Sequence, residues 1–412
     1  MSFTDFFLIL IFVFWLALAI RYFCTILIPL WRESFLYHPV LIIESDDWSP
    51  GPLEDAEILG QLNSVLKDHL DYRGHPAVMT LGIVLSTPYE IYTNREGVDK
   101  IRRHFFTDTM FKDLAEAIKR GEKTGCFSLQ LHAMDHFWPA LLVARAKEND
   151  AILSWVNRTP FPRTEDLSSQ LQGRWARAEK IPAERLTQAD IDRAVLQEVD
   201  AFKRFSGRSP KVVVPPAFMW TKSVESAWEK AGIKIVVTPG RRFESYDEKG
   251  RPHPCREKVR NGDKSKSGLI YVIRDNYFEP SFGHKAEKAI SALFKKTAVG
   301  RPTLIETHRF NFIQNPPATE NAVKELDILL GQSLSLFPDL MFLSTEKLAS
   351  MISKKDPSIV AKSFVYKLPL WLARIEEDKH YSLSGLLSGL APIFVLAHRV
   401  IQLVLKNHKQ MK

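Results

Sequence analysis

Two adjacent carboxylates, Asp46 and Asp47, end an apolar run in the stretch LIIESDDWSP. A second apolar run ends in LHAMDHF, which contains His132 and His136, and a later one ends in ETHRF, which contains His308. Carboxylates and imidazoles bind divalent metal ions, and they are also the side chains that most often move protons in catalysis. These residues therefore predict a site where a metal ion and two proton-transferring groups act together.

His132 and His136 are four residues apart, so both imidazoles lie on one face if the chain turns helical after the strand. Two histidines and one carboxylate leave coordination positions open for water, and nitrogen-rich ligation favours zinc. The second carboxylate is then free to accept a proton from an attacking water, and a further histidine can protonate a leaving amine. A helix cap or Asx turn before PGPLEDAEIL explains one of the two aspartates but not both.

Short β-like runs alternate with amphipathic helical stretches from residue 40 onward. This alternation predicts parallel strands with helical crossovers, and seven or eight such units predict a closed or nearly closed α/β barrel. Functional groups gather at the carboxyl ends of such strands, so the aspartates and the three histidines should converge on one face. The expected strands are 40–45, 77–86, 126–132, 211–215, 234–238, 269–274, 302–307 and 340–344. The expected helices are about 53–70, 97–121, 137–147, 188–206, 221–231, 284–298 and 318–336.

Two polar segments, 148–187 and 239–267, interrupt this rhythm with proline, glycine and charged residues. Long segments of this kind in a compact domain are usually functional, so we expect excursions over one end of the barrel. The barrel domain is expected to cover residues 35–354.

The N-terminal sequence is apolar without a break over residues 6–20, and after Arg21 it continues to Trp31. This is long enough to span a bilayer if Arg21 reaches the interface, so residues 1–34 are predicted to be a membrane anchor. No positive residues precede the run and no small-residue cleavage site follows it, unlike in a signal peptide. Asp5 before the run, with Arg21 and Arg32 in and after it, gives a slight charge bias toward a cytoplasmic barrel.

The C-terminal tail, residues 355–412, is apolar but punctuated by charges. Residues 383–397 carry no charge, and the end of the chain is basic. This pattern is typical of amphipathic helices in a membrane interface. Packing of these helices on the barrel is the alternative.

The overall composition excludes several other classes of protein. The chain has 412 residues, is 45% hydrophobic and 25% charged, and carries a net charge of +8. The positive charge suits an anionic membrane surface, but no basic stripe interleaved with aromatic residues indicates nucleic acid. Three cysteines without a CxxC pattern argue against a zinc ribbon and a disulfide framework.

The motifs resemble those of the NodB-homology polysaccharide deacetylases, and in particular a branch with ESDDW, FEPS and HRxNF signatures. This chain has IIESDDWSP, LHAMDHF, IRDNYFEPS and ETHRFNF in that order over about residues 38–350. The resemblance implies a distorted (β/α)7 barrel that hydrolyses an N-acyl group of an amino sugar with the help of one divalent metal ion. Carried over, it makes Asp46 the base, His308 the general acid, and Asp47, His132 and His136 the metal ligands.

The resemblance also implies a sugar pocket shaped by Phe218 and Trp220, in VVVPPAFMW. Trp48 stands where the family usually has glycine, so it is expected to narrow or reshape that pocket. The family also usually has an arginine that pairs with the catalytic aspartate, and VVVPPAF offers none. The candidate replacements are Arg274, Arg242 and Arg309, the last of which is also a candidate substrate contact.

Together these features predict a membrane-anchored, metal-dependent hydrolase that removes an acetyl or formyl group from an amino sugar of a glycan or lipid-linked glycan. The arginine missing from its usual place favours an alternative of another class, a glycan-binding or assembly component of polysaccharide biosynthesis or export. A glycoside hydrolase on a related barrel is a third hypothesis.

Overall fold

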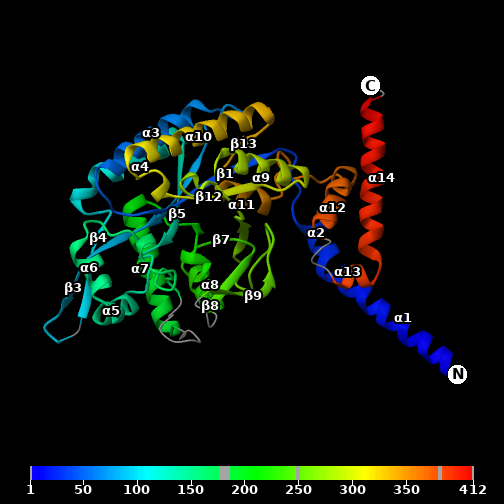
Figure 1. Ribbon diagram of the computed structural model, residues 1–412, viewed down its shortest axis with the longest axis horizontal. Coiled ribbons are helices and arrows are strands. Elements are labelled where there is room, and N and C mark those ends of the chain that lie inside the picture. Colours follow the sequence, from blue (N-terminus) through cyan, green and yellow to red (C-terminus); the bar gives the residue numbers. More distant parts are fainter. Residues whose placement is uncertain (1, 98, 176–185, 247–250, 379–382, 411–412) are drawn as a thin grey trace. The chain divides into compact units, whose positions relative to one another are not determined.

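The computed structural model describes the chain except for residues 1, 98, 176–185, 247–250, 379–382 and 411–412 (Figure 1). It divides into two compact units, each described here by itself. The larger unit comprises Val40–Leu293 and Thr303–Ser350. The smaller unit comprises Met1–Pro39, Phe294–Pro302 and Met351–Lys412.

A parallel β-sheet forms the centre of the larger unit. The strand order is β10-β7-β6-β5-β2-β1-β12-β11, and β13 also pairs with β1. The strands are β1 (Val40–Trp48), β2 (Met79–Val84), β5 (Phe127–Ala133), β6 (Val212–Val213), β7 (Ile235–Thr238), β10 (Ile270–Ile273), β11 (Asn276–Tyr277), β12 (Thr303–His308) and β13 (Met341–Phe342). Every residue of β1 is buried, as expected for a parallel strand that is covered on both faces.

The sheet must curl strongly, because its two end strands are neighbours in the sequence. Only Arg274 and Asp275 separate β10 from β11, a link that reaches about 10 Å. A flat sheet would hold the first and last of eight strands about 34 Å apart. No pairing between β10 and β11 is seen among the described residues, so the barrel is incompletely closed. The predicted α/β fold with a distorted barrel is confirmed.

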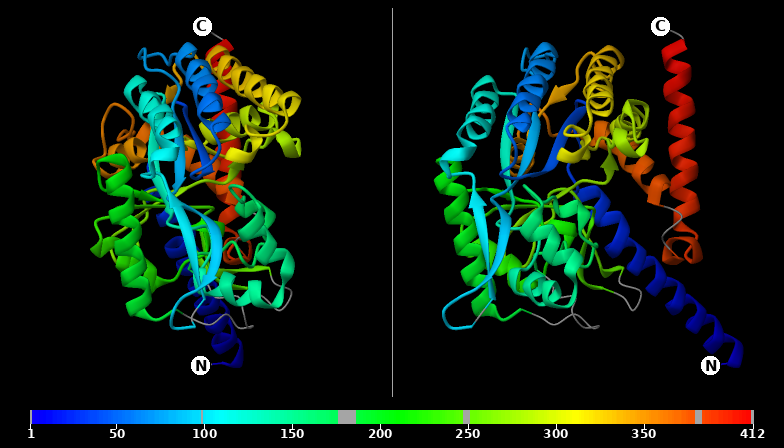
Figure 2. Two further views of the ribbon diagram at one scale, coloured as in Figure 1. Left: turned by 90° about the vertical axis from the view of Figure 1, so that its left-hand side faces the viewer. Right: turned by 60° about the vertical axis from the view of Figure 1, so that its left-hand side comes forward.

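Most of the helices that connect the strands bury apolar faces in one hydrophobic core with the sheet, whereas α5 and α6 bury theirs in a separate cluster. Helix α3 packs between α4 and α10 (Figures 1 and 2). The helices are α3 (Glu54–Asp68), α4 (Lys112–Thr124), α5 (Pro139–Glu148), α6 (Asp150–Arg158), α7 (Gln188–Ser206), α8 (Lys222–Lys230), α9 (Ala286–Ala298), α10 (Pro316–Leu336) and α11 (Thr345–Ser353).

Two antiparallel hairpins were not predicted. The first pairs β3 (Ser86–Thr93) with β4 (Asp99–Phe105) and projects beyond the sheet (Figure 2). The predicted helix 97–121 is therefore wrong over its first part, because pairing with β3 outweighs the local helical pattern. The second pairs β8 (Arg241–Tyr246) with β9 (Pro252–Lys258) and fills much of the expected excursion at 239–267. The excursion at 148–187 begins with α6, and its residues 176–185 lie outside the described part.

The smaller unit is helical in its described part. Its elements are α1 (Phe3–Tyr22), the π-helix η1 (Phe23–Leu27), α2 (Ile28–Arg32), α12 (Phe364–Asp378), α13 (Leu383–Leu387) and α14 (Leu390–Gln410). Six buried residues form its apolar core: Tyr22, Leu27, Leu30, Leu372, Ile375 and Ala391.

Candidate active site

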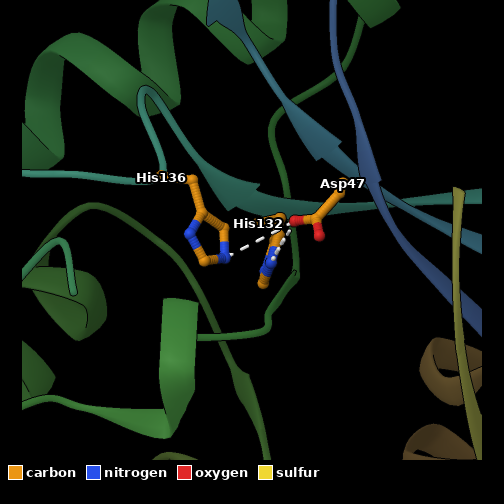
Figure 3. A group of neighbouring side chains, drawn as sticks. All are labelled: Asp47, His132 and His136. Carbon is orange, nitrogen blue, oxygen red and sulfur yellow. Dashed lines mark ion pairs between the residues drawn. The ribbon is translucent and has the colours of Figure 1, made fainter. Parts of the chain in front are cut away.

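Asp47, His132 and His136 meet at the carboxyl ends of β1 and β5 (Figure 3). The Nε2 atom of His132 lies 3.2 Å from Oδ1 of Asp47, and the Nε2 atom of His136 lies 3.5 Å from the same oxygen. One ligand atom from each residue lies within 4.8 Å of the other two, and all three side chains are buried. The three predicted metal ligands are thus brought together.

A β-bulge at the end of β1 aims the carboxylate of Asp47. Ser45 lies opposite Leu81 of β2, but Trp48 lies opposite Ile83, so β1 carries one extra residue between these two pairs. Asp47 takes a left-handed conformation with φ of 69° at this point. Bulges re-aim side chains and strained φ values concentrate at functional sites, so the chain distorts β1 where the candidate ligand stands.

A hydrogen bond to the backbone fixes the orientation of the His132 ring. Its Nδ1 atom lies 2.8 Å from the carbonyl oxygen of Val214, which accepts a hydrogen bond from Nδ1–H and leaves Nε2 facing Asp47. His136 follows in a bent segment between β5 and α5, not in the helical turn that its spacing suggested. The bend still brings the two rings within 4.9 Å of each other, measured between centroids.

The protonation states of two of these residues, Asp47 and His136, fit a divalent ion, whereas the charges of Asp46 and Asp47 raise the pKa of His132 in spite of its burial. Burial lowers the pKa of His136 to about 4, so its imidazole is neutral at pH 7 and offers a lone pair. Burial would raise the pKa of Asp47, but His136 and His132 outweigh it and lower the pKa, so this carboxylate stays ionised. Asp47 Oδ1 and His136 Nδ1 are buried without a hydrogen-bond partner among the described residues. A buried carboxylate oxygen without a hydrogen-bond partner is costly unless a cation faces it, so the donor set suits a metal such as zinc.

Asp46 is held by Arg274, one of the three arginines considered as its partner. Nη2 of Arg274 lies 2.6 Å from Oδ2 of Asp46, and the same guanidinium pairs with Glu44 at 2.8 Å and Glu306 at 3.1 Å. Burial would raise the pKa of Asp46, but Arg274 and His132 lower it, so Asp46 is ionised. Its other oxygen, Oδ1, has no hydrogen-bond partner among the described residues and is available as an acceptor.

The other two candidate arginines serve different carboxylates. Arg309 pairs with Asp55 and donates to Ser49 Oγ at 2.8 Å. Arg242 pairs with Glu225 at 3.2 Å. Of the three arginines, Arg274 is therefore the one that pairs with Asp46, and it lies in the link between β10 and β11.

His308 lies directly opposite Asp46 in the register of β12 and β1. Its Nδ1 atom is 2.6 Å from Oε1 of Glu279, and Glu279 also accepts a hydrogen bond from Asn311. Burial would lower the pKa of His308, but the hydrogen bond to Glu279 and the charges of Asp47, Glu279 and Glu306 raise it to about 10. His308 therefore carries a proton at neutral pH. Glu279 belongs to the FEPS motif, and this motif was the signal that could have identified Glu279 as a residue of the site.

Asp135 is a second residue without a predicted role, although it lies between the two candidate ligand histidines. It is fully buried, accepts a hydrogen bond from Ser86 Oγ at 2.6 Å, and pairs with Arg103 at 2.9 Å and Arg174 at 3.0 Å. These partners come from β3, β4 and the segment after α6. Asp135 thus connects the segment between His132 and His136 to the β3–β4 hairpin and to the segment after α6.

The predicted substrate-contacting aromatics differ in their surroundings. Trp48 and Trp220 are each only 1% exposed, and their indole nitrogens donate to Ser45 Oγ and Glu225 Oε1. Both rings therefore belong to the core and can shape a pocket only through packing. Phe218 is half-buried, and the guanidinium of Arg274 lies 5.1 Å from its ring centroid.

A cavity of about 780 Å³ is lined by residues that follow β1 and β12, among them Pro52, Asp55 and Phe312. Arg309 lines it, as do the aromatic rings of Phe161 and Phe312 and several carboxylates and amides. The segment at 159–166 forms part of its wall, and in that segment burial and the charge of Asp47 raise the pKa of Glu165. Arg309 is thus the member of the predicted site that lines the cavity, and the three candidate metal ligands are not among its lining residues.

Comparisons with known proteins give a likeness to solved structures only. No family model matches the chain, and no curated protein matches it. A protein described as a polysaccharide deacetylase from Mycobacterium smegmatis is 10% identical, with a TM-score of 0.39 over 77% of this chain and 91% of that one. The peptidoglycan deacetylase PdaC from Bacillus subtilis is 12% identical, with a TM-score of 0.37 over 78% and 95%. A family 4 acetyl xylan esterase from Clostridium thermocellum, solved with a cobalt ion, is 12% identical, with a TM-score of 0.33 over 76% and 91%. At these values the likenesses carry no argument about function, which rests on the site itself.

Proposed function

We propose that this protein is a metal-dependent hydrolase that removes an N-acyl group, acetyl or formyl, from an amino sugar. The observation that supports this most is that a candidate metal site and two candidate proton-transferring residues lie at the same end of the sheet. Asp47, His132 and His136 offer a metal site, and Asp46 and His308 stand beside it on paired strands with opposite protonation states. Hydrolysis of an amide needs this combination, because one proton must leave the attacking water and another must reach the departing nitrogen.

A zinc ion held by the three ligands would acidify water and polarise the acyl carbonyl. Asp46 is ionised and presents Oδ1, so it accepts the proton of the attacking water. His308 is bound to Glu279 through Nδ1, and its Nε2, which lies 3.6 Å from Glu306 Oε1, donates a proton to the departing amine. Arg274 keeps Asp46 ionised and in place.

The rest of the substrate is proposed to occupy the cavity beside Arg309. Aromatic rings together with carboxylates and amides suit a sugar, because rings stack on its apolar face and the polar groups bind its hydroxyls. Arg309, which lines the cavity, and Phe218, which lies against Arg274, are the proposed substrate contacts. The substrate class is accordingly an amino sugar within a glycan or a lipid-linked glycan.

Identifying the bond that is cleaved tests this proposal. Purified protein loaded with zinc is incubated with N-acetyl and N-formyl amino sugars, as single units and as oligomers. Equal amounts of carboxylate and free amine, with no new reducing ends, are expected. New reducing ends would establish the glycoside hydrolase instead, and binding of oligomers without any product would support the glycan-binding alternative.

The position of Asp46 gives a first testable prediction, since Gly82 of β2 leaves the space that its carboxylate fills. A Cβ atom at Gly82 would overlap Oδ1 of Asp46. Gly82→Ala should therefore displace the acceptor and lower turnover by about 10²-fold, the loss typical of a misplacement of about 1 Å, while metal content is unchanged. Gly60→Ala on α3 is the control, because its Cβ would enter open space. Wild-type turnover in Gly82→Ala would show that this position of Asp46 is not needed.

The pH dependence of turnover gives a second prediction. His308 must be protonated to donate, so activity should fall as the pH rises through its pKa, which Glu279 helps to raise to about 10. Glu279→Gln removes a charge and weakens the hydrogen bond, so the alkaline limb of the pH profile of kcat should move to lower pH, by about one unit or more. Glu287→Gln, on α9, is the control. If the alkaline limb of Glu279→Gln did not move, the limb would report the titration of a group other than His308.

The membrane is the second proposed partner. The continuous helical segment Phe3–Arg32 has a mean hydropathy of 2.5 over its most apolar stretch, which is 0% buried. Its length and composition are sufficient to cross a bilayer. We propose that it anchors the protein at a membrane surface, where a lipid-linked glycan would be available.

A further inference from the structure

The smaller unit exposes apolar side chains at both ends of the chain. Along α1, the side chains from Phe6 to Phe14 are each about half exposed or more. The C-terminal helices show the same feature on one side. Their exposed apolar residues are Leu383, Leu386, Leu387, Ile393, Leu396, Val400, Leu403 and Val404. Exposed apolar surface of this extent marks a site of protein or membrane contact.

The two apolar surfaces are joined by direct contacts between α1 and α13. The indole Nε1 of Trp15 donates to the carbonyl oxygen of Ser388 at 2.9 Å. Gly385 packs so closely on the ring of Tyr22 that a Cβ atom there would overlap the ring. The segment around α13 therefore runs beside the half of α1 between Trp15 and Tyr22.

These contacts fix the depth of α13 relative to α1. The hydrocarbon core of a bilayer is about 30 Å thick, which an α-helix crosses in about 20 residues. The part of α1 that precedes Trp15, from Phe3 to Phe14, rises only about 18 Å and is too short to cross alone. If α1 spans the membrane, Trp15 lies within the hydrocarbon, and Ser388 lies at the same depth.

The charge pattern of the tail agrees with this depth. No charged residue occurs from 383 to 397, the stretch that contacts α1 and begins α14. The first titratable groups after it are His398 and Arg399, and both pair with Glu376 of α12. Nδ1 of His398 lies 2.6 Å from Oε2 of Glu376, and Nη2 of Arg399 lies 3.7 Å from Oε1. An uncharged segment is what the hydrocarbon core tolerates.

We propose that α13 and the first turns of α14 are embedded in the bilayer beside α1. The anchor then consists of two parts of the chain, and the hydrocarbon of the lipid covers the exposed faces of both. This inference does not depend on the proposed catalytic activity. It differs from a tail that lies flat in the interface, because residues 383–397 share the depth of the spanning helix.

Fluorescence quenching in liposomes tests this placement in the full-length chain. Leu386→Cys, in a background with Cys24→Ser and Cys255→Ser, is labelled with a small environment-sensitive dye and reconstituted into phosphatidylcholine and phosphatidylglycerol vesicles. Leu196→Cys is the matched control, since Leu196 is an exposed leucine of α7 in the larger unit. Lipids with a quencher midway along the acyl chain should quench the dye at 386 several-fold more than the dye at 196. Aqueous iodide should show the reverse order.

Two results would overturn the proposal. Quenching of the dye at 386 by iodide as strongly as at 196 would place α13 in water. A dye shielded from both quenchers, together with cross-linked dimers through position 386, would show that a second copy of the chain covers this face. Leu396→Cys on α14 repeats the measurement at a second exposed leucine and guards against a local effect of the substitution at 386.

Discussion

Replacing His132 with alanine should remove the bound divalent ion and abolish hydrolysis. His132 supplies one of three ligand atoms, and its loss leaves Asp47 and His136 to hold the ion alone. We expect the metal affinity to fall by more than the 10–100-fold that follows loss of an outer-shell partner. The fold should survive, because leaving the Val214 carbonyl without its partner costs about 1–3 kcal/mol, against a typical domain stability of 5–15 kcal/mol. Elemental analysis of the purified variant measures the metal, and circular dichroism follows unfolding.

A matched control distinguishes the effect of losing a metal ligand from the effect of losing a histidine elsewhere in the chain. His253 lies in β9, is exposed, and belongs to no metal-ligand group of the described residues. His253→Ala should retain one ion per chain and wild-type turnover. If His132→Ala bound the ion as tightly as the wild type, the assignment of the metal site would be wrong.

Asp46→Asn and His308→Ala should each lower turnover by about 10²–10⁴-fold while metal content stays near that of the wild type. Asparagine preserves the shape of Asp46 but cannot accept the proton of the attacking water. Alanine at 308 removes the proton that the departing amine needs. Single-turnover rates on an N-acyl amino sugar, with metal content measured on the same samples, give both quantities.

The double variant sharpens this prediction. If the two groups serve the same reaction, Asp46→Asn combined with His308→Ala should lose less than the product of the single losses. Asp68→Asn, at an exposed position of α3, is the control and should leave turnover unchanged. A normal rate in His308→Ala would remove the acid from the mechanism and leave His308 as a structural residue bonded to Glu279.

The fold could be predicted where the local pattern and the tertiary environment agree. The run beginning at Val40 reads as a buried strand and forms β1, and the amphipathic stretch after Thr187 forms α7 at the expected bounds, with Thr187 capping its first turn. Strand β4 could not be predicted in this way, since DKIRRHF is highly charged and its strand conformation depends on pairing with β3. The pairing of β3 with β4 is a tertiary feature, so the residues of β4 alone do not predict it.

The candidate metal ligands could be located because strand ends converge in any parallel barrel. The partners of the proton-transferring groups could not, because Arg274 lies 228 residues from Asp46 and the pairing depends on how the sheet curls. Trp48 shows the same limit. The resemblance suggested that Trp48 shapes the pocket, but its ring packs in the core, next to a bulge in β1 that the sequence does not reveal.

The most direct test of the central claim is a metal titration of hydrolysis. The purified full-length protein is stripped with a chelator and then titrated with zinc, while bound metal and carboxylate released from an N-acyl amino sugar are measured in the same samples. We predict that release is lost on stripping and returns in proportion to bound metal, up to one ion per chain, with one free amine for each carboxylate. Release that persists in the stripped protein, or a protein with one ion per chain that releases no carboxylate from any N-acyl amino sugar, would contradict the account.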